Sequence, residues 1–341
     1  MSAPPLAVVF GLAGPALAAA ERDFFRSADP LGFILFARNC ESPAQVRALV
    51  ADLRETVGRA DAPVLIDQEG GRVARLGPPH WPARPAAARY GALMDRGEDI
   101  AAEAAWLGAR LIARDLFDLG ITVDCAPVLD LPVPGAHDVI GDRAFAADAA
   151  TVSRLGRAFC DGLLAGGVLP VVKHVPGHGR ARADSHRALP TVDTPLDALA
   201  ATDFAPFRAL ADMPWAMTAH VLYPAIDPAA PVTVSATAIA SVVRGTIGFD
   251  GVLVSDDLAM AALSGTPGVR ARAALAAGCD VALHCSGDLG AMAEIADAAR
   301  RIDAAGAARL ARAAQTVHAP EPFDAAAAEA RLGALLAGAD A

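Results

Sequence analysis

Eight short apolar runs, separated by longer alanine-rich amphipathic stretches, are the feature that most constrains the fold of this chain. The runs lie near residues 6–10, 31–36, 63–67, 121–126, 168–172, 215–219, 251–255 and 279–284. Short apolar runs bounded by turn residues are typical of buried strands. Strands that alternate with helices predict a parallel sheet with right-handed crossovers, and eight such units fit a closed barrel. We therefore predict an α/β fold, a (β/α)8 TIM barrel that forms a single domain over residues 1–341.

A doubly wound open sheet is the alternative fold for the same alternation of elements. The glycine-rich dinucleotide-binding fingerprint that usually follows its first strand is missing from this sequence. We predict that residues 305–341 form a terminal helix and a loosely held tail.

Helix-start signals occur in the gaps between the predicted strands. Ser42 and Ser235 stand where an N-cap side chain is expected, and Asp193-Thr194-Pro195 opens a further helix that runs to about residue 211. The other predicted helices cover residues 99–118, 151–165, 236–246, 268–277 and 289–303.

The charge balance and the cysteines limit the classes of partner and compartment. The net charge of −10 argues against nucleic acid, which selects clustered lysine and arginine. The five cysteines form no C-x-x-C pair, which predicts small buried thiols in a reducing cytoplasm and not a disulfide framework or a thiolate metal site. They are Cys40, Cys125, Cys160, Cys279 and Cys285.

Residues 1–20 carry no charged side chain and therefore resemble a targeting segment. However, no lysine or arginine precedes Arg22, and three prolines interrupt the run. Leu6-Ala7-Val8-Val9-Phe10 followed by Gly11 instead predicts a first strand that ends in a turn. We expect neither a secretory signal nor a membrane segment.

Polar side chains follow six of the predicted strands at the point where each strand ends. In a barrel of this kind, the carboxyl ends of the strands meet at one face, where active sites are built. The residues are Asp67-Gln68-Glu69, Asp130 with Asp142-Arg143, Lys173-His174, His220, Ser255-Asp256-Asp257 and His284. The sequence therefore predicts an active site at this face.

Residues 173–186 concentrate three histidines, a lysine and an aspartate in one loop after the fifth strand. Asp184 precedes His186 by two residues, a spacing that lets the carboxylate orient the imidazole as a general acid and base. His174 and His178 raise the possibility of a shared divalent ion. Because Pro176 and Gly177 disfavour a helix between them, a metal site is the minor hypothesis.

Two adjacent carboxylates end the seventh strand, and they are predicted to differ in role. Asp256 directly follows the strand and is suited to attack an anomeric carbon as a nucleophile. Asp257 is interpreted as structural, because it can begin a helix.

Several hydroxyl groups of one ligand would need both donors and acceptors in the same place. The candidate substrate-binding residues are Asp67, Arg75, Arg143, Lys173 and His174. For Arg75 and Arg143, a salt bridge at the barrel rim is an equally acceptable interpretation.

Three motifs together resemble the family 3 glycoside hydrolases, and specifically the bacterial β-N-acetylhexosaminidases of cell-wall recycling. They are Ile66-Asp67-Gln68-Glu69-Gly70-Gly71-Arg72-Val73, Lys173-His174-Val175-Pro176-Gly177-His178-Gly179 with Asp184-Ser185-His186, and Val254-Ser255-Asp256-Asp257-Leu258-Ala259-Met260. The resemblance runs from about residue 8 to residue 285. One departure is Val175, where the family usually has phenylalanine.

The resemblance implies a retaining exo-β-N-acetylglucosaminidase that acts on N-acetylglucosamine β-1,4-linked to anhydro-N-acetylmuramoyl peptides. It implies that Asp256 is the nucleophile, that His186 is the acid/base supported by Asp184, and that the five binding residues hold the terminal sugar. We expect a cytoplasmic monomer without a metal or another cofactor, whose partners are muropeptides and neither nucleic acid nor membranes.

Four alternatives remain open at this point. Within the family, they are a β-glucosidase and a phosphorylase that uses phosphate in place of water. Outside it, they are a metal-dependent hydrolase that uses His174 and His178, and a sugar-binding protein without catalysis.

Overall fold

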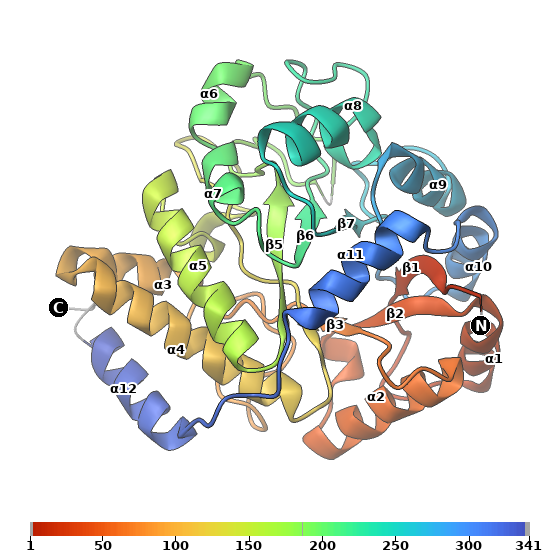
Figure 1. The fold of residues 1–341 in the computed structure, drawn as a ribbon, viewed down its shortest axis with the longest axis horizontal. Coiled ribbons are helices and arrows are strands. Elements are labelled where there is room, and N and C mark those ends of the chain that lie inside the picture. The colour runs from red at the N-terminus through yellow and green to blue at the C-terminus, as the bar shows by residue number, and fades with distance from the viewer. Residues whose placement is uncertain (1–2, 186, 338–341) are drawn as a thin grey trace.

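Eight parallel strands close into a barrel in the computed structural model, which describes residues 3–185 and 187–337 (Figure 1). Each strand pairs with the next along the chain, and β8 pairs with β1 to close the sheet. The strands are β1 (Leu6–Phe10), β2 (Pro30–Leu35), β3 (Val64–Ile66), β4 (Val123–Asp124), β5 (Leu169–Val175), β6 (Trp215–Thr218), β7 (Val252–Asp257) and β8 (Val281–His284). The predicted (β/α)8 barrel is confirmed, and the open-sheet alternative is wrong.

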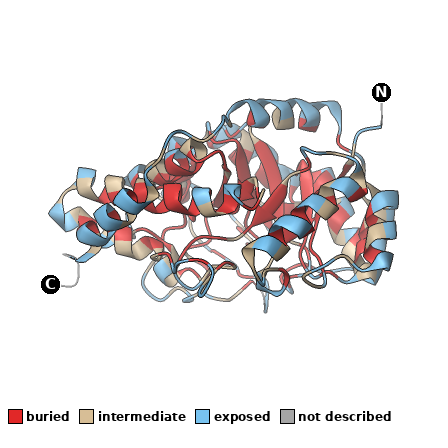
Figure 2. Cartoon of the chain, turned by 90° about the horizontal axis from the view of Figure 1, so that it is seen from below, coloured by how far each residue is buried: buried red, intermediate tan, exposed pale blue. Residues whose placement is uncertain are grey.

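The strands are almost entirely buried, as Figure 2 shows, and their β-branched and leucine side chains form the centre of the core. A register shift between Lys173 and Val175 interrupts the pairing of β5 with β6. Irregularities of this kind often lie next to active sites, where they re-aim side chains.

Helices surround the barrel and connect successive strands (Figure 1). They are α1 (Ala19–Ala28), α2 (Pro43–Val57), α3 (Ala87–Gly91), α4 (Glu98–Phe117), α5 (Ala149–Ala165), α6 (Leu196–Ala201), α7 (Phe204–Ala209), α8 (Ala236–Ala238), α9 (Pro267–Ala277), α10 (Leu289–Ala298), α11 (Ala304–Gln315) and α12 (Ala325–Ala337). The two predicted serine caps are confirmed: Ser42 Oγ accepts the Gln45 N–H, and Ser235 Oγ accepts the Ala238 N–H. Among the described residues, no helix is both long and apolar enough to cross a membrane.

Three predicted helices differ from the observed elements. The helix expected up to residue 211 is divided into α6 and α7 at Thr202, whose hydroxyl hydrogen-bonds to the Ala198 carbonyl and the Asp203 carboxylate. Residues 236–246 continue from α8 into a π-helix over Ile239–Thr246. The helix expected over residues 289–303 ends at Ala298.

The C-terminal region contains two helices where the sequence suggested one helix and a loose tail. Helix α11 lies across the end of the barrel where the strands begin, and α12 packs against α4 (Figure 1). Arg84 is almost completely buried and pairs with both Asp115 of α4 and Glu329 of α12. The described part of the tail up to residue 337 is therefore docked on the barrel.

Candidate active site

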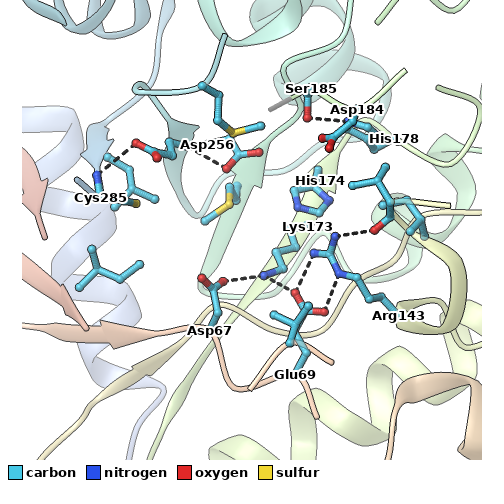
Figure 3. Close-up of a pocket in the computed structure, with 18 of the residues that line it drawn as sticks. Asp67, Glu69, Arg143, Lys173, His174, His178, Asp184, Ser185, Asp256 and Cys285 are labelled. Carbon is cyan, nitrogen blue, oxygen red and sulfur yellow. Dashed lines mark hydrogen bonds and ion pairs between the residues drawn. The ribbon is translucent and has the colours of Figure 1, made fainter. Parts of the chain in front are cut away.

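A cavity of about 410 Å³ opens at the carboxyl ends of the barrel strands (Figure 3). Its volume falls within the range of about 300–1,000 Å³ that is usual for small-molecule sites. Seven of the eight residues proposed for catalysis and binding line this one cavity, and they come from β5, β7 and the segments after β3, β4 and β5. They are Asp67, Arg75, Arg143, Lys173, His174, Asp184 and Asp256.

The eighth residue, His186, lies outside the described residues. Asp184 and Ser185, which directly precede it, both line the cavity. The role of His186 as the acid/base stays a prediction.

A chain of alternating charges lines the cavity and runs from Arg75 through Asp67, Lys173 and Glu69 to Arg143. Figure 3 shows the last four of these side chains. Arg75 Nη2 lies 3.0 Å from Asp67 Oδ2, and Lys173 Nζ lies 2.8 Å from Asp67 Oδ1. Lys173 Nζ also lies 2.6 Å from Glu69 Oε1. Arg143 donates to both oxygens of Glu69, over 2.8 and 2.9 Å. We name these five residues the charge chain.

The charge chain keeps its members ionised although they are removed from water. Burial alone would raise the pKa of Asp67, but Lys173 and Arg75 outweigh it and hold that pKa below its usual value. Burial would likewise lower the pKa of Lys173, and the two carboxylates raise it instead. The pair therefore offers a fixed cation and a fixed anion to a ligand.

His174 is held by a buried carboxylate that the sequence analysis did not assign to the site. Its Nδ1 lies 2.7 Å from Asp130 Oδ2, and Asp130 is completely buried. Asp130 Oδ1 also accepts the backbone N–H groups of His174 and His178, at 3.3 and 2.7 Å. The start of the loop after β5 is thereby attached to the loop after β4.

The two histidines considered as metal ligands are engaged in other contacts. His174 Nδ1 contacts Asp130, and His178 Nε2 lies 3.1 Å from Ser185 Oγ. Burial, together with His174, lowers the pKa of His178 to about 4. No three His, Cys, Asp or Glu side chains within residues 3–185 and 187–337 are arranged to hold a metal ion.

Asp256 is the penultimate residue of β7 and faces the cavity opposite the charge chain (Figure 3). Its Oδ1 accepts the backbone N–H of Asp257 over 2.8 Å. Burial would raise the pKa of Asp256, but His220, His174 and this N–H keep it below the usual value. The carboxylate is therefore ionised at neutral pH, as a nucleophile requires.

The helix expected to begin at Asp257 is absent: Asp257 is the last residue of β7, and the next helix, α9, begins at Pro267. Asp257 Oδ1 accepts the backbone N–H groups of Ala259 and Cys285, at 3.0 and 3.1 Å. It thereby joins the segment after β7 to the end of β8.

Apolar side chains also line the cavity, and we call five of them the apolar wall. Its members are Ile34, Phe36, Met217, Met260 and Leu283. The guanidinium of Arg75 lies 5.1 Å from the centre of the Phe36 ring, so the wall and the charge chain meet there. Such a combination suits a ring with hydroxyl groups on its edge and C–H groups on its faces.

Sequence reasoning did not assign Glu69 and Asp130 to the site, although both were noted at strand ends. Glu69 lies two residues after Asp67, which was the available signal for a second inward-facing carboxylate. Among the described residues, the side-chain partners of both are distant in sequence: Arg143 is 74 residues from Glu69, and His174 is 44 residues from Asp130.

Comparisons with known proteins agree on one family. The family model described as the glycosyl hydrolase family 3 N-terminal domain matches residues 17–318. A beta-hexosaminidase from Bordetella avium is 40% identical over 289 residues, which cover 83% of this chain and 81% of that protein. One from Methylococcus capsulatus is 41% identical over 282 residues, 82% of each chain.

A solved structure also matches the whole fold. The crystal structure of NagZ from Neisseria gonorrhoeae in complex with N-trifluoroacetyl-D-glucosamine has a TM-score of 0.87 and 34% sequence identity. The match covers 98% of both chains.

Proposed function

Because this chain belongs to glycosyl hydrolase family 3 and is a β-N-acetylhexosaminidase, we propose that it releases N-acetylglucosamine from the non-reducing ends of peptidoglycan fragments. The single observation that carries this proposal is the placement of Asp256 across one cavity from the charge chain. The proposed nucleophile and the proposed hydroxyl-binding residues thus line the same cavity.

In the proposed mechanism, the terminal sugar is held by Asp67, Arg75, Arg143, Lys173 and His174. A carboxylate oxygen of Asp256 attacks the anomeric carbon, and the bond from that carbon to the leaving oxygen breaks. His186, supported by Asp184, gives its proton to that oxygen. A covalent glycosyl-enzyme results.

In the second step, His186 accepts a proton from a water molecule as the water attacks the same carbon. The bond to Asp256 breaks and the carboxylate is restored. Two inversions at one carbon give net retention of the β configuration. A histidine in place of the usual second carboxylate brings no further negative charge close to Asp256.

The peptidoglycan substrate rests on the resemblance of the three motifs to enzymes of cell-wall recycling. The relative from N. gonorrhoeae is described in complex with an N-acylated glucosamine, which supports the same class of sugar in this cavity. A cytoplasmic location agrees with five cysteines that are all free thiols. Cell fractionation tests the location, and size-exclusion chromatography tests the expected monomer.

Trapping with a 2-fluoro sugar tests nucleophile and stereochemical class together. The expected result is a covalent adduct on the peptide that contains Asp256, located by mass spectrometry. An adduct on another residue, or active enzyme that forms none, would overturn the proposed mechanism.

Substrate comparisons separate the remaining alternatives. The expected result is faster release of 4-nitrophenol from the N-acetyl-β-glucosaminide than from the β-glucoside, with a rate that phosphate does not raise. Activity that survives dialysis against a chelator argues against a metal-dependent hydrolase. Saturable sugar binding without turnover would indicate a binding protein. Release of the sugar from an anhydro-muropeptide tests the natural substrate.

A further inference from the structure

Asp130 contributes no atom to the proposed chemistry, yet all its hydrogen bonds point to residues around the cavity. Its pKa is lowered although it is buried, and the two backbone N–H groups that Oδ1 accepts favour the ionised form. The ionised carboxylate has no hydrogen to donate. The 2.7 Å contact with His174 therefore needs a proton on Nδ1 of the histidine.

The other ring nitrogen of His174 faces a different environment. The ring lines the cavity, and no hydrogen bond to Nε2 occurs among the described residues. When Nδ1 of a neutral imidazole carries the proton, Nε2 has a lone pair and accepts hydrogen bonds.

An acceptor at this position is valuable because the cations of the charge chain only donate. Arg75, Lys173 and Arg143 have no acceptor atoms. A sugar hydroxyl that accepts a hydrogen bond from Lys173 must donate its own proton elsewhere. Nε2 of His174, the next residue along β5, can accept that hydrogen bond.

We propose that Asp130 is a positioning residue that keeps a proton on Nδ1 of His174 and thereby leaves Nε2 as the acceptor for a sugar hydroxyl. The proposal rests on the proposed function only for the identity of the ligand. The state of the imidazole itself can be measured without substrate.

Asp130→Asn is the decisive variant, because it separates the tautomer from the fold. The amide oxygen still accepts the backbone N–H groups of His174 and His178. The amide nitrogen, however, donates to Nδ1, which moves the ring proton to Nε2. A cavity acceptor becomes a donor, while the backbone contacts remain.

Nitrogen-15 NMR of the histidine rings gives the first measurement, with the His174 signals assigned by their loss in His174→Gln. The wild type is expected to show neutral His174 protonated on Nδ1, and Asp130→Asn is expected to show it protonated on Nε2. A wild-type ring that is protonated on Nε2, or on both nitrogens, overturns the proposal. This result is independent of whether Asp130→Asn folds.

Steady-state kinetics on the 4-nitrophenyl N-acetyl-β-glucosaminide give the second measurement. Asp130→Asn is expected to lower kcat/KM by about a hundredfold, mainly through KM, since a hydroxyl is left between two donors. In a His174→Ala background the same substitution should have almost no further effect. An equal loss in both backgrounds would mean that Asp130 does not act through His174.

Asp280→Asn is the matched control. Asp280 is also a buried aspartate that accepts a backbone N–H, from Leu253, and pairs with arginines, but it lies at the start of β8, away from the cavity. We expect it to lower stability and leave KM unchanged. A wild type without turnover would refute the proposed function and leave the NMR result standing.

Discussion

Lys173 and Glu69 form the closest contact of the charge chain, with 2.6 Å between Nζ and Oε1. Both side chains are almost completely buried, and the contact joins β5 to the segment after β3. Both oxygens of Glu69 are already occupied by Lys173 and Arg143, so Glu69 acts on a ligand through those two cations.

Glu69→Gln is therefore expected to raise KM for the N-acetylglucosaminide by about tenfold with a smaller effect on kcat. The neutral amide keeps the shape of the side chain but no longer balances two cations, so Lys173 is drawn towards Asp67. Steady-state kinetics with the aryl glycoside measure the effect.

Glu103→Gln is the control for this prediction. Glu103 makes a similar two-oxygen contact with Arg331, at 2.7 and 2.6 Å, but on the surface between α4 and α12. The KM of Glu103→Gln should equal that of the wild type. Equal KM values for the two variants would contradict the role assigned to Glu69.

Asp256→Asn is expected to reduce kcat by about a thousandfold or more, because an amide oxygen is a poor nucleophile. Asp257→Asn gives a comparison one residue away. Its amide oxygen can still accept the N–H groups of Ala259 and Cys285, so we expect a loss below about tenfold. Comparable losses in both variants would contradict the division of roles between the two aspartates.

The barrel could be predicted from the sequence because each strand appears there as a short apolar run followed by polar residues. Strand β1 matches its predicted range. The helix predicted up to residue 211 is divided at Thr202, four residues before Pro206, which has no N–H to donate to the Thr202 carbonyl. The site depends on contacts that no local pattern reveals. Lys173 was visible from its position at a strand end, but the carboxylates that hold it and His174 in place depend on which loops the barrel brings together.

The lowered pKa of His178 predicts that the free energy of unfolding decreases in acid. Its pKa is lowered from 6.5 to about 4, mainly by burial, so the unfolded state binds more protons between these values. The contribution of His178 is complete above pH 6.5 and is lost as the pH falls through 4. At pH 5 the loss is about 2 kcal/mol in the free energy of unfolding. Urea unfolding at pH 7 and pH 5 should show this loss in the wild type and not in His178→Gln.

The raised pKa of Asp124 predicts the opposite trend, a free energy of unfolding that decreases as the pH rises. This aspartate at the end of β4 is completely buried: Oδ1 accepts the Gln68 N–H over 2.9 Å, and Oδ2 has no hydrogen-bond partner among the described residues. Burial outweighs the Gln68 N–H and Lys173 and raises its pKa from 3.8 to about 8. The folded state therefore keeps a proton that the unfolded state loses, and the contribution of Asp124, complete below pH 3.8, is lost as the pH rises through 8.

Asp124→Asn removes this titration and can keep the acceptor for Gln68. The free energy of unfolding of the variant, minus that of the wild type, should rise with pH by about 1.4 kcal/mol for each pH unit between 4 and 8 and then level off. Urea unfolding at pH 5, 7 and 8.5 measures the difference. Because the substitution itself changes stability equally at every pH, only the slope is diagnostic, and a constant difference would mean that Asp124 is ionised in the folded protein at neutral pH.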